Sequence, residues 1–396
     1  MTPAAGRTPL LAVASQLARV GANLTVIAPG MEPLRVGDRP DTTRVVCHAA
    51  DTLRPLLRGD HLALAEAYLN GQIDVHGDLL EVMKLTDVLD LDPSWLIKAA
   101  LWLRLRLPDR RRYQRAAIAF HYDQSPEFFL GWLDRWRSYS HGFYRAPDDD
   151  VTSAQARKLQ FAIDALGLQP GMNVFDMGGG WGCFVEYAGL QGIRVHTITI
   201  SAVQYRFLQR LIEAQRLPCT VELVDFLDYR PPVRFDGAVF MGTLEHMPTY
   251  ERVTAFLAQH LTPHARVYAD FCAQRTSFVG GTFLRRYLWP GPVTYVNVQR
   301  LVRVLITAGF NLYELHDDTL SYAYTVRDWA NNVEAIRGEL AAQAGEPTVR
   351  AFLLFLRGAY HFLTTNRTQA YHLVAGRQPA PLPRSAPLPS PPGGVE

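Results

Sequence analysis

Residues 174–183, VFDMGGGWGC, carry the strongest local signal in this sequence. An apolar run leads to Asp176, glycines occupy 178–180, and Gly182 precedes a helical pattern. Consecutive glycines let a backbone turn tightly and approach a ligand closely. A dinucleotide-binding turn would read GxGxxG and be followed by an acid at the end of the next strand. Here Cys183 stands at the last position and the next strand ends in ITISAVQ, so nicotinamide binding is weakly supported.

Strand and helix patterns alternate on both sides of this turn. Alternation of this kind predicts an α/β fold, in which helices cover both faces of a largely parallel sheet. The expected strands are 172–177, 195–201, 220–226, 235–242 and 265–273, with a last strand near the end of 361–377. The expected helices are 153–168, 183–192, 202–217 and 250–261.

Composition excludes several classes of protein. The 396 residues are 48% hydrophobic and 20% charged, as in ordinary globular proteins, and the net charge of +2 argues against a globally basic nucleic-acid binder. The four cysteines form no CxxC pair or zinc spacing, which predicts a reducing cytoplasm and no metal site. No apolar run reaches the length of a membrane-spanning helix, and residues 1–30 favour a helix and a short strand over a signal peptide.

The pattern divides the chain into four parts. Residues 1–92 predict a small α/β domain, and residues 93–150 a helical, aromatic-rich connector that caps the site. Residues 151–376 carry the strand–helix alternation, with a covering insertion at about 274–300. Residues 377–396 hold seven of the 26 prolines and predict a disordered tail.

Two segments ahead of the sheet have unusual compositions. Seven basic residues and one acidic residue lie between Lys98 and Arg115, among leucines and tryptophans. This predicts an interfacial helix on an anionic membrane surface, with a solvated helix face as the alternative. In residues 120–144, eleven of 25 side chains are aromatic or histidine. Such a segment is more often core, but it can also line an apolar tunnel.

The segment FMGTLEHM, residues 240–247, places Glu245 and His246 at the end of an expected strand. Ligands of open α/β sheets bind at the carboxyl ends of the strands. A carboxylate beside an imidazole can bind a cation or move a proton there. The alternative is a surface pair that caps a helix.

These pieces together resemble the cyclopropane fatty acid synthase family, which includes the mycolic acid cyclopropane synthases. The resemblance spans about residues 35–376. Its pieces, in order, are LAEAYLNGQIDVHGDL (64–79), FHYDQSPEFF (120–129), Tyr139-Ser140, Gln155 with Lys158, LGLQPGMNVFDMGGGWG (166–182), TISAVQ (199–204), GTLEHM (242–247) and SYAYTVRDWANN (321–332).

The resemblance implies a class I methyltransferase fold that is Rossmann-like, with a mostly parallel seven-stranded sheet and a small N-terminal α/β domain. It implies S-adenosylmethionine (SAM) as cofactor and transfer of its methyl group to a double bond of a lipid acyl chain. By family position, the cofactor-binding residues are Tyr139, Ser140, Asp176, Gly178, Gly179, Gly180, Thr199, Gln204, Asp225 and Phe226. For Asp225 the alternative is a helix N-cap.

The resemblance also implies catalytic roles for Glu245, His246, Asp270 and Tyr322. In cyclopropanating members, the tyrosine at the position of Tyr322 lies near a bound bicarbonate. Asp270 and Cys272 stand where the family usually has histidine and isoleucine. Two nearby carboxylates would repel bicarbonate, so this cofactor is doubtful. Asp270 or Glu245 could then serve as the base, and we favour a methylene- or methyl-branched product over a ring.

The expected substrate is therefore an unsaturated acyl chain of a membrane phospholipid, methylated at the inner face of the membrane by a cytoplasmic, peripheral enzyme. A separate reductase and a homodimer are left open as partners. Two other functions are weighed: a small-molecule amine N-methyltransferase of the same fold, and an inactive lipid-binding relative.

Overall fold

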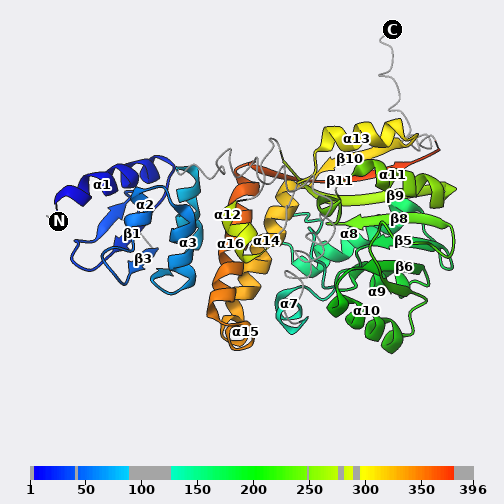
Figure 1. Cartoon of the computed structure of the whole chain (residues 1–396), viewed down its shortest axis with the longest axis horizontal. Coiled ribbons are helices and arrows are strands. Elements are labelled where there is room, and N and C mark those ends of the chain that lie inside the picture. The colour runs from blue at the N-terminus through cyan, green and yellow to red at the C-terminus, as the bar shows by residue number, and fades with distance from the viewer. Residues whose placement is uncertain are drawn as a thin grey trace, which may run out of the picture.

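The computed structural model describes residues 4–40, 43–88, 126–247, 249–274, 281–288 and 295–378. The basic segment 98–115, the first part of the aromatic-rich segment and the proline-rich tail from residue 379 lie outside the described residues. The described residues form two sheets, at opposite ends of the molecule, and a group of helices stands between them (Figure 1).

The smaller sheet belongs to the N-terminal part of the chain. Its strand order is β2-β1-β3-β4, with β1 and β3 parallel and the other pairs antiparallel. The elements are α1 (Ala4–Arg19), β1 (Leu24–Ile27), β2 (Leu34–Val36), β3 (Arg44–Cys47), α2 (Arg54–Leu57), α3 (His61–Leu69), β4 (Ile73–His76), α4 (Leu79–Met83) and the 3₁₀ helix η1 (Lys84–Asp87). Asp60 and Asp78 begin α3 and α4 by accepting backbone N–H bonds.

The larger sheet has seven strands in the order β10-β11-β9-β8-β5-β6-β7, and β11 runs antiparallel to both of its neighbours. The strands are β5 (Asn173–Met177), β6 (Arg194–Thr199), β7 (Thr220–Leu223), β8 (Phe235–Met241), β9 (Leu261–Gln274), β10 (Asn311–Asp317) and β11 (Thr368–Gly376). The mostly parallel α/β sheet predicted from the sequence is confirmed. Strand β10, which the sequence analysis did not single out, forms one edge.

Helices cover both faces of this sheet. The remaining elements are α7 (Pro126–Trp132), α8 (Val151–Leu166), α9 (Cys183–Gly189), α10 (Ala202–Gln215), η2 (Leu244–His246), α11 (Tyr250–His260), α12 (Thr282–Tyr287), α13 (Val298–Thr307), α14 (Thr319–Ala335), α15 (Arg337–Ala344) and α16 (Glu346–Thr364). Successive residues of β5 point to opposite faces of the sheet. Val174 packs with α8, α9 and α10 on one face, and Phe175 packs with α11 and α13 on the other.

A third core lies among the helices beside the sheet. Phe128, Phe129 and Trp132 of α7 are completely buried against Trp329 of α14 and Phe352 of α16. Much of the aromatic-rich segment is therefore core. Helices α14 and α16, which form part of this core, stand between the N-terminal sheet and the large sheet (Figure 1), so they connect the two parts of the molecule.

Candidate active site

A cavity of about 170 Å³ opens at the carboxyl ends of β5, β6 and β8, around the glycine-rich turn. All ten residues predicted to bind the cofactor line it: Tyr139, Ser140, Asp176, Gly178, Gly179, Gly180, Thr199, Gln204, Asp225 and Phe226. Sequence analysis missed others, including Arg137, Ser138 and Thr243. No pattern of residue types marks these three, because neighbouring elements bring them to the cavity.

The turn has no room for side chains. Gly178 has a φ of +81°, and a Cβ at this position would lie 2.8 Å from Cγ2 of Thr243. A Cβ at Gly179 would lie 2.4 Å from Oγ1 of Thr197. Both distances are below contact range, so a side chain at either position would force the turn or its threonine neighbour to shift.

Polar groups line the same cavity. The Thr199 hydroxyl donates to Oε1 of Gln204 at 2.9 Å, while Nε2 of Gln204 is buried without a hydrogen-bond partner among the described residues. Burial raises the pKa of Asp176 to about 7. Asp225 accepts the Leu227 N–H at 2.9 Å, so it closes a local turn as well as lining the cavity. Buried polar groups normally have hydrogen-bond partners, so the unsatisfied Nε2 of Gln204 indicates that a polar ligand binds here.

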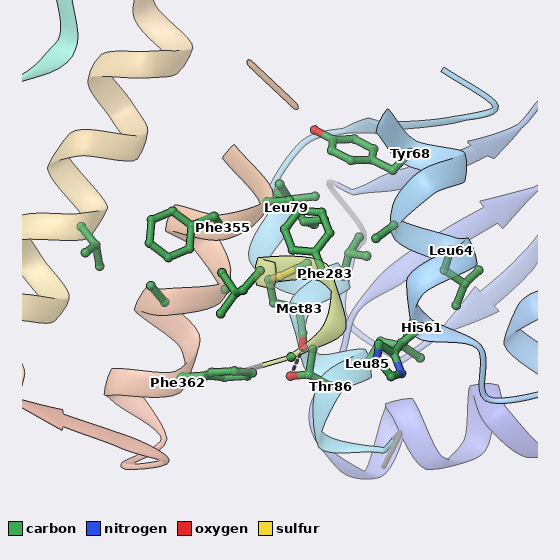
Figure 2. A pocket seen from close by; sticks show the side chains of 18 of the residues that line it. His61, Leu64, Tyr68, Leu79, Met83, Leu85, Thr86, Phe283, Phe355 and Phe362 are labelled. Carbon is green, nitrogen blue, oxygen red and sulfur yellow. Dashed lines mark hydrogen bonds between the residues drawn. The ribbon is translucent and has the colours of Figure 1, made fainter. Parts of the chain in front are cut away.

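A second, larger and mainly apolar cavity of about 370 Å³ extends from the end of β8 into the N-terminal domain. Figure 2 shows its distal part, where Phe355 and Phe362 of α16 and Phe283 of α12 face Leu64 and Tyr68 of α3. Leucines and valines of the N-terminal sheet line the far end: Leu24, Val26 and Val45. The N-terminal domain, whose role the sequence left unexplained, thus supplies one wall of this cavity.

Polar contacts hold the N-terminal domain against α16. Nη1 of Arg350 donates to the backbone oxygens of Tyr68 and Ile73 at 2.9 and 3.1 Å, and Nη2 contacts Asp74 at 2.7 Å. His361 contacts Asp87 at 3.0 Å. These contacts keep the two walls of the apolar cavity together.

The two cavities meet at three residues, Tyr139, Gly242 and His246, which line both. Glu245 and Tyr322 line the apolar cavity near this point. Three of the four residues predicted to be catalytic, Glu245, His246 and Tyr322, are therefore brought together. Cys272, Tyr295 and Trp329 join them on the same wall.

Burial sets the protonation states of Glu245 and His246. Oε1 of Glu245 accepts the Cys272 N–H at 2.6 Å, and desolvation raises the pKa of this carboxyl to about 8. Desolvation also lowers the pKa of His246 to about 4, so its imidazole is neutral at physiological pH. A carboxyl with a pKa near neutrality is suited to accept a proton.

Aromatic side chains surround the meeting point. The ring centroids of Tyr139 and Trp329 lie 5.3 Å apart, and those of Tyr322 and Trp329 lie 6.3 Å apart. All three side chains line the apolar cavity. Their faces carry negative partial charge and can stabilise a cation that is shielded from water.

Asp270, expected as a substitute base, lies behind the lining of the two cavities. It is completely buried and is not among the described residues that line the two cavities. Its Oδ1 accepts the Gly242 N–H at 2.8 Å, Oδ2 accepts the Ser140 hydroxyl at 3.3 Å, and Nζ of Lys158 lies 3.7 Å from Oδ2. These contacts assign Asp270 to holding Ser140 and Gly242 in place. Its charge also helps to raise the pKa of Glu245.

Comparison with known proteins identifies the chain. Residues 109–373 match the family described as mycolic acid cyclopropane synthetase, and this match covers more than half of the chain. The chain belongs to this family. The resemblance inferred from the sequence is thereby confirmed.

Individual members of the cyclopropane synthetase family and related proteins cover most of the chain. A probable fatty acid methyltransferase of Pseudomonas putida is 28% identical over 314 residues, which are 76% of this chain and 78% of that protein. The cyclopropane-fatty-acyl-phospholipid synthase of Escherichia coli K12 is 26% identical over 347 residues, covering 83% and 86%. The structure of mycolic acid cyclopropane synthase CmaA1 complexed with SAH and CTAB has a TM-score of 0.60 at 21% identity, covering 66% and 97%.

This cyclopropane synthetase family member is a SAM-dependent methyltransferase with the class I fold. The 170 Å³ cavity fits the cofactor, since its glycine wall is open and its buried Gln204 amide has a donor to offer. When bound, SAM supplies an electrophilic methyl group. Gln204, Asp225 and the glycine turn would hold it beside the apolar cavity.

Proposed function

We propose that this enzyme methylates a double bond in an unsaturated fatty acyl chain of a membrane phospholipid. The observation that carries the proposal is the junction of a cofactor cavity with a long apolar cavity at Tyr139, Gly242 and His246. Reacting groups held in neighbouring cavities gain rate through proximity and orientation. The apolar cavity suits a hydrocarbon chain, because its walls are mainly leucine, valine and aromatic side chains.

An alkene is a weak nucleophile, so the enzyme must align it and keep water away from the cation that forms. Tyr139, Tyr322 and Trp329 present aromatic surface at the junction. Each desolvated aromatic face contributes about 1–2 kcal/mol to a nearby cation. The neutral imidazole of His246 adds no positive charge that would repel the cation.

The cation must then lose a proton, and Glu245 is the base that the geometry supports best. Its carboxyl lines the apolar cavity and has a pKa of about 8. After a hydride shift, removal of a proton from the added methyl group leaves a methylene branch, whereas removal without the shift closes a cyclopropane ring. We favour the methylene branch, which a separate reductase would saturate to a methyl branch.

We favour the methylene branch over the ring because the surroundings of Glu245 do not suit a bound bicarbonate. Its Oε1 already takes the Cys272 N–H, and no arginine or lysine is among the described residues that line the apolar cavity. A bicarbonate placed there would leave water for a site that is lined mainly by apolar and aromatic side chains, and losing its hydration is costly. Bicarbonate therefore stays doubtful as a cofactor.

Membrane contact belongs to the same proposal. Among the described helices, none is both long and apolar enough to cross a membrane. We propose that the basic residues between Lys98 and Arg115 bring the enzyme to an anionic phospholipid surface, at the inner face of the membrane. The homodimer stays a prediction.

The test uses the purified full chain, SAM with a radiolabelled methyl group, and vesicles of dioleoyl phosphatidylglycerol. Label is expected in the acyl chains. Vesicles of dipalmitoyl phosphatidylglycerol, which lack a double bond, are the control and are expected to stay unlabelled. SAM binding without labelling of either lipid would contradict the proposal. Labelling of small amines under the same conditions would favour the N-methyltransferase.

A further inference from the structure

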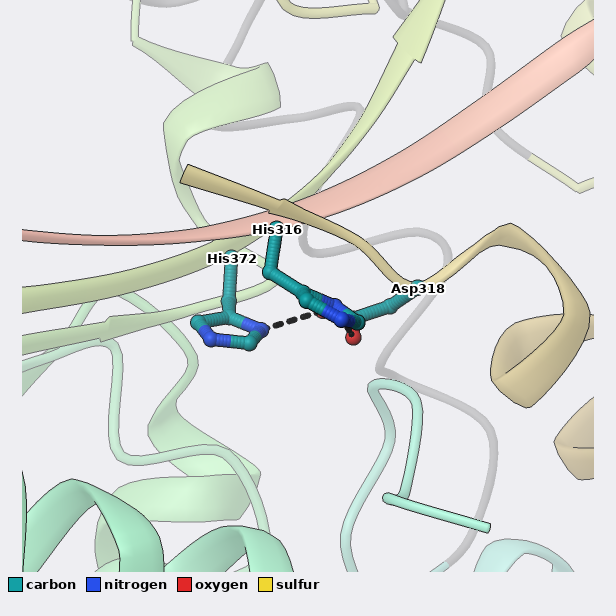
Figure 3. Close-up of side chains that lie close together, drawn as sticks. All are labelled: His316, Asp318 and His372. Atoms are coloured by element: carbon teal, nitrogen blue, oxygen red, sulfur yellow. Dashed lines mark hydrogen bonds and ion pairs between the residues drawn. The ribbon is translucent and has the colours of Figure 1, made fainter. Parts of the chain in front are cut away.

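A cluster of histidines and carboxylates lies outside both cavities, at the edge of the large sheet. His316 is on β10, His372 is on β11, and Asp318 directly precedes α14 (Figure 3). Nδ1 of His372 lies 2.6 Å from Oδ2 of Asp318, and Nδ1 of His316 lies 2.9 Å from Oδ1. One nitrogen or oxygen from each of the three residues lies within 4.8 Å of the others.

The sheet itself places these side chains together. His316 and His372 are direct partners in the antiparallel pairing of β10 with β11, so their side chains point to the same face. Their rings stack with centroids 5.2 Å apart. His372 and Asp318 are buried, while His316 is exposed. The cluster is therefore rigid on its inner side and reachable from solvent on its outer side.

A second layer of groups orients the first. Oε1 of Glu314 lies 3.3 Å from Nε2 of His372, the nitrogen that faces away from Asp318. Nε2 of the buried His141 lies 3.0 Å from Oδ2 of Asp318. Metal-binding histidines usually donate their second N–H to a carboxylate, and metal-binding carboxylates usually accept a further hydrogen bond. Both features are present here.

We propose that His316, Asp318 and His372 bind one divalent transition-metal ion of the zinc type. Two imidazole nitrogens and one carboxylate oxygen are ligands that Zn²⁺ accepts, with solvent completing the coordination. The ion would bind Nδ1 of each histidine, so binding releases to solvent any proton that these atoms carry. Sequence spacing did not reveal the site, since His372 is far from the other two residues in the chain.

The site would join β10, β11 and the start of α14. Asp318 is the residue between β10 and α14, whereas β11 is distant from both in the chain. Asp318 precedes α14, and α14 carries Tyr322 on the wall of the apolar cavity. A bound ion would thus fix β10, β11 and the start of α14 relative to one another. The inference does not depend on the identity of the methyl acceptor.

The experiment uses the untagged full chain, freed of metal by a chelator and titrated with Zn²⁺ against a chromophoric competitor. One ion per chain is expected. Loss of this binding is expected in His316→Ala, where the removed ring is exposed and folding should be unaffected. The matched control is His48→Ala, which removes an exposed histidine 2.7 Å from Asp74 outside any such cluster. Its Zn²⁺ binding should equal that of the wild type.

A third variant tests the second layer of groups, to which Glu314 belongs. Glu314→Gln keeps all three ligands and is expected to weaken Zn²⁺ binding by about 10–100-fold. Co²⁺ in place of Zn²⁺ should give a visible absorption spectrum that changes in Glu314→Gln and disappears in His316→Ala. A wild-type chain that takes up no Zn²⁺, or a His316→Ala chain that binds it as tightly as the wild type, would overturn the proposal.

Discussion

Replacing Glu245 by glutamine tests the base directly. Glutamine keeps the size of the side chain but cannot accept a proton at neutral pH. General bases contribute about 10²–10⁴-fold to rate, so methyl transfer should fall by that factor. SAM affinity should change little, because Glu245 lines the apolar cavity and is not among the described residues of the cofactor cavity. Methyl transfer from labelled SAM and calorimetric titration of SAM measure the two effects.

The pH dependence of the same variant gives a second readout. A base must be ionised to act, so wild-type activity should rise with pH and level off above the Glu245 pKa of about 8. Glu245→Gln should lose this rise. Glu251→Gln is the matched control, since Glu251 is an exposed glutamate on α11 paired with Arg300, and its profile should follow the wild type.

The raised pKa of Glu245 also predicts how the free energy of unfolding changes with pH. The folded pKa of about 8 lies above the ordinary value of 4.5, so between these values the folded chain keeps a proton that the unfolded chain has released. The free energy of unfolding therefore falls as pH rises through this window, by at most roughly 5 kcal/mol. Denaturant titrations should show a smaller fall in Glu245→Gln. An unchanged pH profile of activity and of stability in this variant would refute the assignment of Glu245 as a buried base.

Three other substitutions test the remaining parts of the site. Gly179→Ala should abolish SAM binding, because its Cβ would lie 2.4 Å from a threonine hydroxyl, whereas Gly338→Ala, with nothing within 4 Å, should bind SAM normally by calorimetry. Leu64→Trp should fill the distal apolar cavity and raise KM for long acyl chains without changing SAM affinity; equal KM values for all chain lengths would speak against an acyl site there. Asp270→Asn should destabilise the fold by about 3–5 kcal/mol by leaving Lys158 buried without its carboxylate, and thermal unfolding would show it.

The sequence predicted the sheet and the cofactor cavity well because both depend on local patterns. The apolar strand before Gly178, the alternation that follows and the residues after each strand place the ligand at the carboxyl ends. Parallel strands bring those ends to one edge, so residues far apart in sequence could be grouped correctly. Thr199, Gln204 and Asp225 were named from the family resemblance, and all three line the cavity at this edge.

Side-chain direction was harder to predict. Asp270 and Cys272 lie on the same strand and differ by two residues, yet Cys272 lines the apolar cavity and Asp270 contacts Lys158 and Gly242. Strand β9 pairs with β11 on one side and β8 on the other, and no local pattern encodes which groups these neighbours bring to each side chain. The N-terminal wall of the apolar cavity was also missed, since it depends on how α16 packs against α3 and α4.

Analysis of the fatty acids made in cells is the most direct test of methylation at an acyl double bond. Cells that express the chain are grown with oleate, and their membrane fatty acids are analysed by gas chromatography with mass spectrometry before and after mild hydrogenation. We predict an acyl chain heavier by one CH₂ group that gains two further hydrogen atoms on hydrogenation, as a methylene branch does. A chain heavier by one CH₂ group that resists hydrogenation would show a ring instead and contradict the favoured product, whereas a saturated methyl branch would be heavier by a further two hydrogen atoms. An unchanged acyl profile, with SAM bound by the purified enzyme, would contradict the account as a whole.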